Sequence, residues 1–358
     1  MSGIMNELAG VDAVWLDGSG PHADIVIATR ARLSRNLAGL PFPHRAGAAE
    51  LATIASDLGR QLRRLPGLAD GWSIEVGACE PRSRQLLREK MLAGPDLLAN
   101  PEHRHLVAAR DLGQAGLLNA EDHLQLCAWR SGFDPVAALA DVMGLDDGLA
   151  GSFEPAFSED YGYLTASPGN VGTGLRLTAV LHLPALVMAD EIDKVLNALR
   201  QLEFGVRGLA GEGRTVRGAL FRVGNLTTLG RDEGEITEDF AAHVGKVISY
   251  ERAARELLLA RDRRGLEDLA WRGRAALEHA RLMTAQEAWD SLSHARLGTG
   301  VGLVPGTATG LSPWGLFNRL LVRQQGAHLE LTAGRVLDGR GKSAARADLL
   351  REHFAAPC

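Results

Sequence analysis

The chain has 358 residues, 46% hydrophobic and 23% charged, which is the composition of an ordinary soluble globular protein and leaves room for two domains. A formal net charge of -5 gives no general attraction to nucleic acid or anionic lipid. Cys79, Cys127 and Cys358 are too far apart for a zinc or disulfide framework, and apolar neighbours make core thiols of two of them. With neither a signal peptide nor a long apolar run, we expect a cytoplasmic protein with no membrane contact.

Strand and helix patterns alternate in the first two thirds of the chain. Strands are predicted at residues 24–36, 116–129, 173–183 and 217–230, the second interrupted by the polar segment 119–123. Helices are predicted at residues 47–65 and 190–204, where apolar residues recur every three or four positions. Together these elements predict a mixed domain of helices and strands.

Beyond residue 255, Ala, Leu, Arg and Glu dominate and strand patterns fade. Thr284-Ala285-Gln286-Glu287 is a capping box that begins a helix running to about residue 294. Further helices are expected from Ser312-Pro313-Trp314 and over residues 345–353. We therefore predict a domain at residues 1–255 and a helical C-terminal domain at residues 256–358.

Two arginines share one face of the first predicted strand. Strand alternation places Arg30 and Arg32 on the same side. Guanidinium groups bind phosphate oxygens through paired, charge-assisted hydrogen bonds. The alternative is an exposed strand whose arginines pair with surface carboxylates.

A polar segment of charged residues interrupts the second predicted strand. Glu121, Asp122 and His123 stand here between apolar residues. A carboxylate in this place can act as a base or hold a guanidinium group. The alternative is a strand end whose polar residues cap a turn.

Two glycine-rich segments follow. Residues 167–174 have the glycine content of a phosphate-binding loop, but they lack a P-loop lysine and the spacing of a dinucleotide fingerprint. A tight turn that needs positive φ is the alternative, although Arg176 just beyond it favours an anion site. Residues 207–213, with Arg207 and Glu212, predict either a mobile lid or an exposed hairpin loop.

Taken in order, these segments resemble the bacterial protein-arginine kinases, a branch of the ATP:guanido phosphotransferase family. The resemblance rests on residues 29–37, 119–124, 162–184 and 207–213 and spans nearly the whole chain. It implies an α+β fold: a phosphagen-kinase-like catalytic domain, in which helices flank an antiparallel sheet, followed by a small helical domain. The implied reaction transfers the γ-phosphoryl group of ATP to an arginine side chain.

The resemblance also implies roles for individual residues. Glu121 would hold the acceptor guanidinium and take its proton, Glu212 would hold it from the other side, and Ser167 would orient it. Mg²⁺ would travel with ATP, held mainly by phosphates and water. The implied ATP-binding residues are Ala28, Thr29, Arg30, Ala31, Arg32, Met91, Gln125, Arg176, Leu177, Thr178, Ala179, Val180, Arg207, Gly208, Leu209, Ala210, Gly211 and Glu212.

The chain departs from the family pattern at several of these places. Ser167 stands where the family has cysteine, Gln125 where it has a phosphate-binding arginine, Met91 where it has histidine, and Ala120 where it has an acidic residue. In the tail, the family's phosphoarginine-binding motif Arg-Asp-x-x-Arg-Ala reads Lys-Ser-Ala-Ala-Arg-Ala over residues 342–347.

The departures keep two alternatives open: a catalytically impaired adaptor that binds nucleotide or phosphoarginine in protein quality control, and a kinase for a free small guanidine. The family's partners are arginine-bearing protein substrates, a zinc-binding activator, a heat-shock repressor and an AAA+ unfoldase–protease. The sequence leaves open which partners this chain has, and whether it forms a homodimer.

Overall fold

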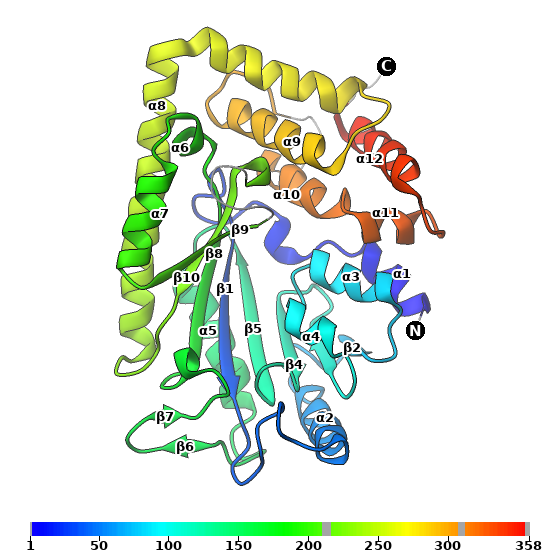
Figure 1. Cartoon of the computed structure of the whole chain (residues 1–358), viewed down its shortest axis with the longest axis vertical. Coiled ribbons are helices and arrows are strands. Elements are labelled where there is room, and N and C mark those ends of the chain that lie inside the picture. Colours follow the sequence, from blue (N-terminus) through cyan, green and yellow to red (C-terminus); the bar gives the residue numbers. More distant parts are fainter. Residues whose placement is uncertain (1, 210–215, 307–311, 355–358) are drawn as a thin grey trace.

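An eight-stranded antiparallel sheet is the centre of the molecule (Figure 1). The computed structural model describes residues 2–209, 216–306 and 312–354. The strand order is β2-β3-β4-β5-β1-β8-β10-β9, so the arginine-bearing strand β1 lies between β5 and β8. The strands are β1 (Val26–Arg35), β2 (Trp72–Glu75), β3 (His105–Ala108), β4 (Gln114–Leu118), β5 (Leu124–Ser131), β8 (Leu175–His182), β9 (Phe204–Gly208) and β10 (Leu220–Asn225), with β6 (Phe157–Ser158) and β7 (Gly162–Tyr163) in a separate small hairpin.

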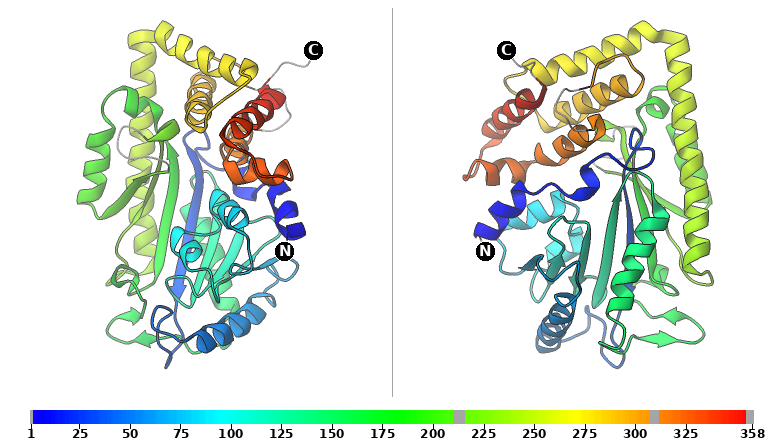
Figure 2. Two further views of the ribbon diagram at one scale, coloured as in Figure 1. Left: turned by 45° about the vertical axis from the view of Figure 1, so that its right-hand side comes forward. Right: turned by 180° about the vertical axis from the view of Figure 1, so that it is seen from behind.

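Helices cover both faces of the sheet (Figures 1 and 2). They are α1 (Ser2–Gly10), α2 (Ala48–Leu62), α3 (Pro81–Glu89), α4 (Pro95–Ala99), α5 (Pro135–Gly148), α6 (Pro184–Met188), α7 (Ile192–Gln201), α8 (Glu233–His279), α9 (Ala285–Gly300), α10 (Pro313–Arg323), α11 (Gly326–Thr332) and α12 (Gly339–Phe354). The described residues also include short 3₁₀ turns: η1 (Val14–Leu16), η2 (Pro168–Asn170) and η4 (Arg217–Ala219).

Each face of the sheet has its own apolar core. On one face, α2, α5, α6, α7 and the first part of α8 cover residues such as Leu33, Leu126 and Leu177. On the other face, α1, α3 and the C-terminal helices α9 to α12 pack around residues such as Trp15 and Trp289. Arg30 and Arg32 alternate with residues of the first core, so their side chains point to the second face.

Most predicted elements are confirmed, with three corrections. Residues 116–129 are two strands, β4 and β5, because the polar segment is the turn of a hairpin. The helix predicted over residues 190–204 ends at Gln201: Leu202 is an exposed C-cap and Phe204 begins β9. The strand predicted over residues 217–230 is only β10, preceded by η4.

The C-terminal helices begin as the capping signals predict, and α9 to α12 all lie beyond residue 255. The side chain of Thr284 accepts a hydrogen bond from the backbone of Glu287, and α9 continues to Gly300. The helix α8 runs along the sheet and then turns across the end of the molecule, with non-helical backbone angles at Asp262 (Figures 1 and 2). The domain boundary near residue 255 lies within this helix and stays a prediction.

Within the described ranges, no helix is both long and apolar enough to cross a lipid bilayer. Cys79 and Cys127 are buried free thiols, as predicted, and Cys358 lies outside the described residues.

Buried polar contacts fasten the C-terminal helices to the sheet. The Nε2 atom of His182, at the end of β8, lies 2.8 Å from the hydroxyl of Ser293 on α9. The guanidinium group of Arg296 donates to the carbonyl of Ala23 at 2.5 Å and to Asn318 on α10 at 2.7 Å. These groups are almost fully buried, so the sheet and the helices share one interior.

This burial predicts a loss of stability in acid. Burial lowers the pKa of His182 well below its ordinary value, and the cations Arg296 and Arg255 lower it further. The unfolded chain therefore takes up this proton at higher pH than the folded chain. The contribution to stability is present above about pH 6.5, the pKa of an unperturbed histidine, and is lost as the pH falls toward the folded-state pKa. We expect His182→Asn to reduce the slope of unfolding free energy against pH by up to about 1.4 kcal/mol per pH unit between about pH 6.5 and 5.

Denaturant unfolding at several pH values measures this slope. His279→Asn is the matched control, because the side chain of His279 is 78% exposed. An unchanged slope in His182→Asn would contradict the prediction.

Candidate functional site

Five arginines lie on one face of four neighbouring strands. They are Arg30 and Arg32 on β1, Arg176 on β8, Arg222 on β10 and Arg207 on β9, and we call them the arginine face. The strand register places Arg32 directly opposite Arg176, and Arg222 directly opposite Arg207. Directly opposed residues of antiparallel strands point to the same side, so the five side chains share one face.

A cavity of about 520 Å³ opens over this face. Its floor includes Arg30, Arg32 and Arg222, and its roof comes from α9 and α10 through Trp289, Asn318 and Leu321. We call it the central cavity. Its size is that of a small-molecule site, and it combines a few charged groups with apolar and aromatic walls.

The arginines of the floor lack anionic partners. The Nε atoms of Arg30 and Arg32 are buried and have no hydrogen-bond acceptor among the described residues. Burial lowers the pKa of Arg30 to about 10, and the cations Arg222 and Arg32 lower it further, against the opposing effect of Cys127. The group remains charged at neutral pH, so the floor is an uncompensated cluster of cations. The alternative of arginines paired with surface carboxylates is not observed for the described residues.

The turn between β4 and β5 presents one carboxylate and buries another. Asp122 is fully buried, and its Oδ1 accepts hydrogen bonds from the side chain of Asn36 at 2.7 Å and from the backbone of Ala166 at 2.8 Å. His123 is also buried and accepts a hydrogen bond from the backbone of Leu37 at its Nδ1. Glu121, the residue before Asp122, is exposed and lines the central cavity. Asp122 and His123 therefore anchor the turn to distant segments, and the carboxylate of Glu121 stays accessible to a ligand.

The buried amide of Asn170 joins this turn to the arginine face. Its Nδ2 donates to Glu121 at 3.5 Å, and its Oδ1 accepts from the Nε of Arg176 at 2.7 Å. A Cβ atom on Gly169 would lie 2.7 Å from the guanidinium of Arg176, so a larger residue here would have to displace that side chain. Burial lowers the pKa of Arg176, the cation of Arg32 lowers it further, and Glu121 raises it.

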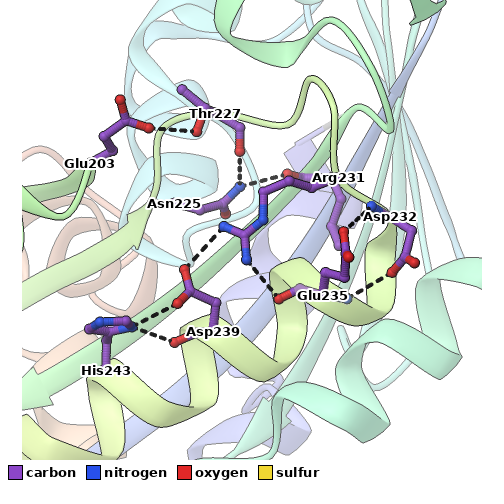
Figure 3. Close-up of polar contacts among 9 residues, drawn as sticks. Glu203, Asn225, Thr227, Arg231, Asp232, Glu235, Asp239 and His243 are labelled. Carbon is purple, nitrogen blue, oxygen red and sulfur yellow. Dashed lines mark hydrogen bonds and ion pairs between the residues drawn. The ribbon is translucent and has the colours of Figure 1, made fainter.

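Asn225 at the end of β10 also binds Arg176. Its backbone carbonyl accepts a hydrogen bond from the guanidinium. The side chain of Asn225 bonds the backbone of Leu177 at 2.8 Å and of Thr227 at 3.2 Å. Figure 3 shows how the following loop is fastened: Thr227 donates to Glu203, and Arg231 pairs with Asp239 on α8. Arg176 is thus fixed from both sides before any ligand binds.

The structure places the predicted site residues in four groups. Those that line the central cavity are Ala28, Arg30, Arg32, Met91, Glu121, Gln125, Thr178, Val180 and Leu209. Those whose side chains point to the opposite face, into its core, are Thr29, Ala31, Leu177 and Ala179. Those beside the cavity, in the loop or on the adjoining strands, are Ser167, Arg176, Arg207 and Gly208. Those outside the described residues are Ala210, Gly211 and Glu212.

Three residues of the site escaped the sequence analysis: Asn170, Arg222 and Asn225. Their roles depend on which strands are neighbours, and a single sequence does not supply that register. Arg222 did leave a signal, since it is the one charged residue between the buried Phe221 and Val223 of a predicted strand.

The tail segment over residues 342–347 lies on α12. Arg346 is 5% exposed, and its guanidinium donates to the carbonyls of Gln324 and Met283, each at 2.9 Å. Arg346 therefore ties α12 to the end of α10 and the start of α9. A second cavity of about 340 Å³ adjoins it and shares Glu89 and Trp289 with the central cavity.

Solved structures of guanidino kinases have a similar fold. A lombricine kinase matches with a TM-score of 0.56 and 21% identity over 68% of this chain and 72% of its own. A duplicated taurocyamine kinase from Schistosoma mansoni, solved with transition-state analogue components, matches with a TM-score of 0.58 and 20% identity over 68% of this chain. The chain covers 34% of that duplicated protein. At these identities the likeness concerns the fold.

The sequence comparisons are more specific. The protein-arginine kinase of Moorella thermoacetica is 39% identical over 354 residues, covering 95% of this chain and 97% of the relative. That of Bacillus subtilis is 33% identical over 342 residues, covering 95% and 93%. Residues 55–254 match the catalytic domain of the ATP:guanido phosphotransferases, and residues 263–357 match the C-terminal domain of the protein-arginine kinase McsB. The chain therefore belongs to the ATP:guanido phosphotransferase family, in the branch of the protein-arginine kinases.

Proposed function

We propose that this protein is an ATP-dependent protein-arginine kinase, which transfers the γ-phosphoryl group of ATP to a guanidinium nitrogen of arginine side chains in proteins. The observation that carries the proposal is the arginine face, which lacks carboxylate partners among the described residues yet stands next to a free carboxylate, Glu121. A polyanion would neutralise the arginines, and a cationic acceptor would pair with Glu121.

The phosphates of ATP suit the arginine face. Arg30, Arg32, Arg176 and Arg207 would each donate charge-assisted hydrogen bonds to phosphate oxygens, and the buried Nε atoms of Arg30 and Arg32 would gain acceptors. Magnesium would be bound mainly by the phosphates themselves and by water. Arg176 is already held by Asn170 and Asn225, so it would stabilise the charge of the transferring group with little reorganisation.

Glu121 suits the acceptor. Its exposed carboxylate would bind the substrate guanidinium and take the proton that the nitrogen loses as it attacks the γ-phosphorus. The new bond is P–N, the bond between the γ-phosphorus and its bridging oxygen breaks, and ADP leaves with the electron pair of that bond. Glu212 would hold the guanidinium from the other side, but it lies outside the described residues.

The replaced residues bear on rate rather than on the type of reaction. Gln125 and Met91 still line the central cavity, and Ser167 follows Ala166, whose backbone Asp122 holds in place. The hydroxyl oxygen of serine can accept a hydrogen bond from a guanidinium N–H but carries no negative charge at neutral pH. We propose that Ser167 orients the acceptor.

The reaction would take place in the cytoplasm, on exposed arginines of protein substrates. Because the chain belongs to this family, we propose three further partners. They are a zinc-binding activator, an AAA+ unfoldase–protease and a second copy of the chain.

The direct test is mass spectrometry. After incubation of the purified protein with Mg-ATP and an arginine-rich protein, we expect acid-labile phosphoarginine on that protein. Free arginine as the acceptor in a parallel reaction separates a protein kinase from a kinase for small guanidines. Absence of phosphoarginine on both acceptors, where a related active kinase produces it, would refute the proposal.

Glu121→Gln should remove the base without disturbing the fold. We expect the rate of phosphoarginine formation to fall by roughly 10²- to 10⁴-fold, the usual contribution of a positioned general base. The thermal midpoint should hardly change, because Glu121 is exposed. Steady-state kinetics and differential scanning fluorimetry of the same sample measure both effects, and a rate close to that of the unaltered protein would exclude Glu121 as the base.

The neighbouring carboxylate provides the matched comparison. Asp122→Ala would leave the backbone N–H of Ala166 without its acceptor and the buried amide of Asn36 with only the carbonyl of Leu164. We expect a loss of about 1–3 kcal/mol in unfolding free energy, the cost of removing one partner from buried hydrogen bonds. Denaturant unfolding measures it, and a loss below about 0.5 kcal/mol would mean that this anchor is dispensable.

A further inference from the structure

Arg222 has no role in the proposal so far, although it lines the central cavity. It lies on β10 between Phe221 and Val223, whose side chains are buried in the core on the opposite face. Strand alternation therefore directs Arg222 to the cavity side. Its surroundings distinguish it from an ordinary surface arginine.

Among the described residues, this guanidinium group has a neighbouring arginine and no paired carboxylate. Arg222 is paired across the sheet with Val180 on one side and Arg207 on the other. Burial lowers the pKa of Arg222, and the cation of Arg207 lowers it further. Arg222 in turn acts on Arg30 as a like charge. A mostly buried charge with no opposite partner is costly, so a ligand that neutralises it is expected.

Arg222 and the other arginines of the arginine face lie on both sides of a group of small residues. Thr178, Gly224 and Gly205 pair with one another across β8, β10 and β9, and all three are small. The pair Arg32 and Arg176 lies on one side of this set along the strands, and the pair Arg222 and Arg207 lies on the other. Strand geometry places the Cα atoms of Arg30 and Arg222 roughly 12 Å apart, so two extended arginine side chains can reach one polyphosphate between them.

We propose that Arg222 binds a phosphate group of the nucleotide, opposite Arg30 and Arg32, and so is a further substrate-positioning residue of the site; this rests on the proposed function. The ligand chemistry is a linear polyphosphate, held by guanidinium groups from both sides of the cavity floor. The competing role is structural: the aliphatic part of Arg222 would cover the apolar floor while its charge faces solvent.

Isothermal titration calorimetry with ATP, inorganic tripolyphosphate and adenosine separates these roles. For Arg222→Gln we expect the dissociation constants of ATP and tripolyphosphate to rise roughly 10- to 100-fold, as for the loss of one charge-assisted contact, and the binding of adenosine to stay unchanged. Arg222→Lys keeps the charge but loses the two-pronged contact, so it should bind better than Arg222→Gln and less well than the unaltered protein.

Arg231→Gln is the matched control. Arg231 is close to Arg222 in the chain but has its own carboxylate partner, Asp239, at 3.1 Å (Figure 3). We expect it to leave the affinity for both phosphate compounds unchanged.

The outcomes are distinguishable. If Arg222→Gln binds ATP and tripolyphosphate as tightly as the unaltered protein, the inference is overturned, whether or not the thermal midpoint falls. The proposed function stays intact in that case, provided that the unaltered protein forms phosphoarginine. If Arg222→Gln does not fold, equal affinity of Arg222→Lys and the unaltered protein for tripolyphosphate would have the same meaning. An unaltered protein that binds neither ATP nor tripolyphosphate would overturn both proposals.

Discussion

Mutual repulsion among the guanidinium groups of the arginine face is the constraint on which the site depends. Arg30, Arg32, Arg176, Arg207 and Arg222 share one side of a sheet, and like charges at this spacing oppose folding. The fold meets this cost with neutral acceptors: Asn170 and the carbonyl of Asn225 bind Arg176. Amide oxygens stabilise a cation without cancelling its charge. The arginines therefore stay available to an anionic ligand. Binding of that ligand removes the repulsion and stabilises the folded protein.

The two adjacent carboxylates show how the chain separates structure from chemistry. Asp122 uses its charge inside the fold, where it ties the β4–β5 turn to the segment that leads to Ser167. Glu121 is then exposed next to the arginine face, with one long hydrogen bond from Asn170. If both carboxylates were free, the turn would lose its bonds to Asn36 and Ala166, and Glu121 would be held less firmly. The burial of one is the reason that the other can be both free and well placed.

Local sequence patterns identified several residues of this site. Only the long-range pairing of strands shows which of these residues are neighbours. Alternation along one strand predicted that Arg30 and Arg32 share a face, and polar residues within an apolar run marked the turn that carries Glu121. Alternation could not show that β10 lies between β8 and β9, which sets Arg222 against Arg207. The family resemblance could not separate Thr29 or Leu177 from their neighbours, because it transfers continuous segments, whereas a strand offers only every second side chain to a ligand.

The composition of the central cavity links the catalytic sheet to the C-terminal helices. Arg30 and Arg32 belong to the sheet, whereas Trp289 and Leu321 belong to α9 and α10. A ligand that fills the cavity must contact both parts, so its binding free energy adds to the free energy that holds the helices against the sheet. Conversely, anything that moves α9 or α10 changes the cavity and hence its affinity for a ligand. The second cavity shares Glu89 and Trp289 with the first, and the carboxylate of Glu89 accepts hydrogen bonds from the backbone at the start of α11. The C-terminal helices are thus a wall of the central cavity.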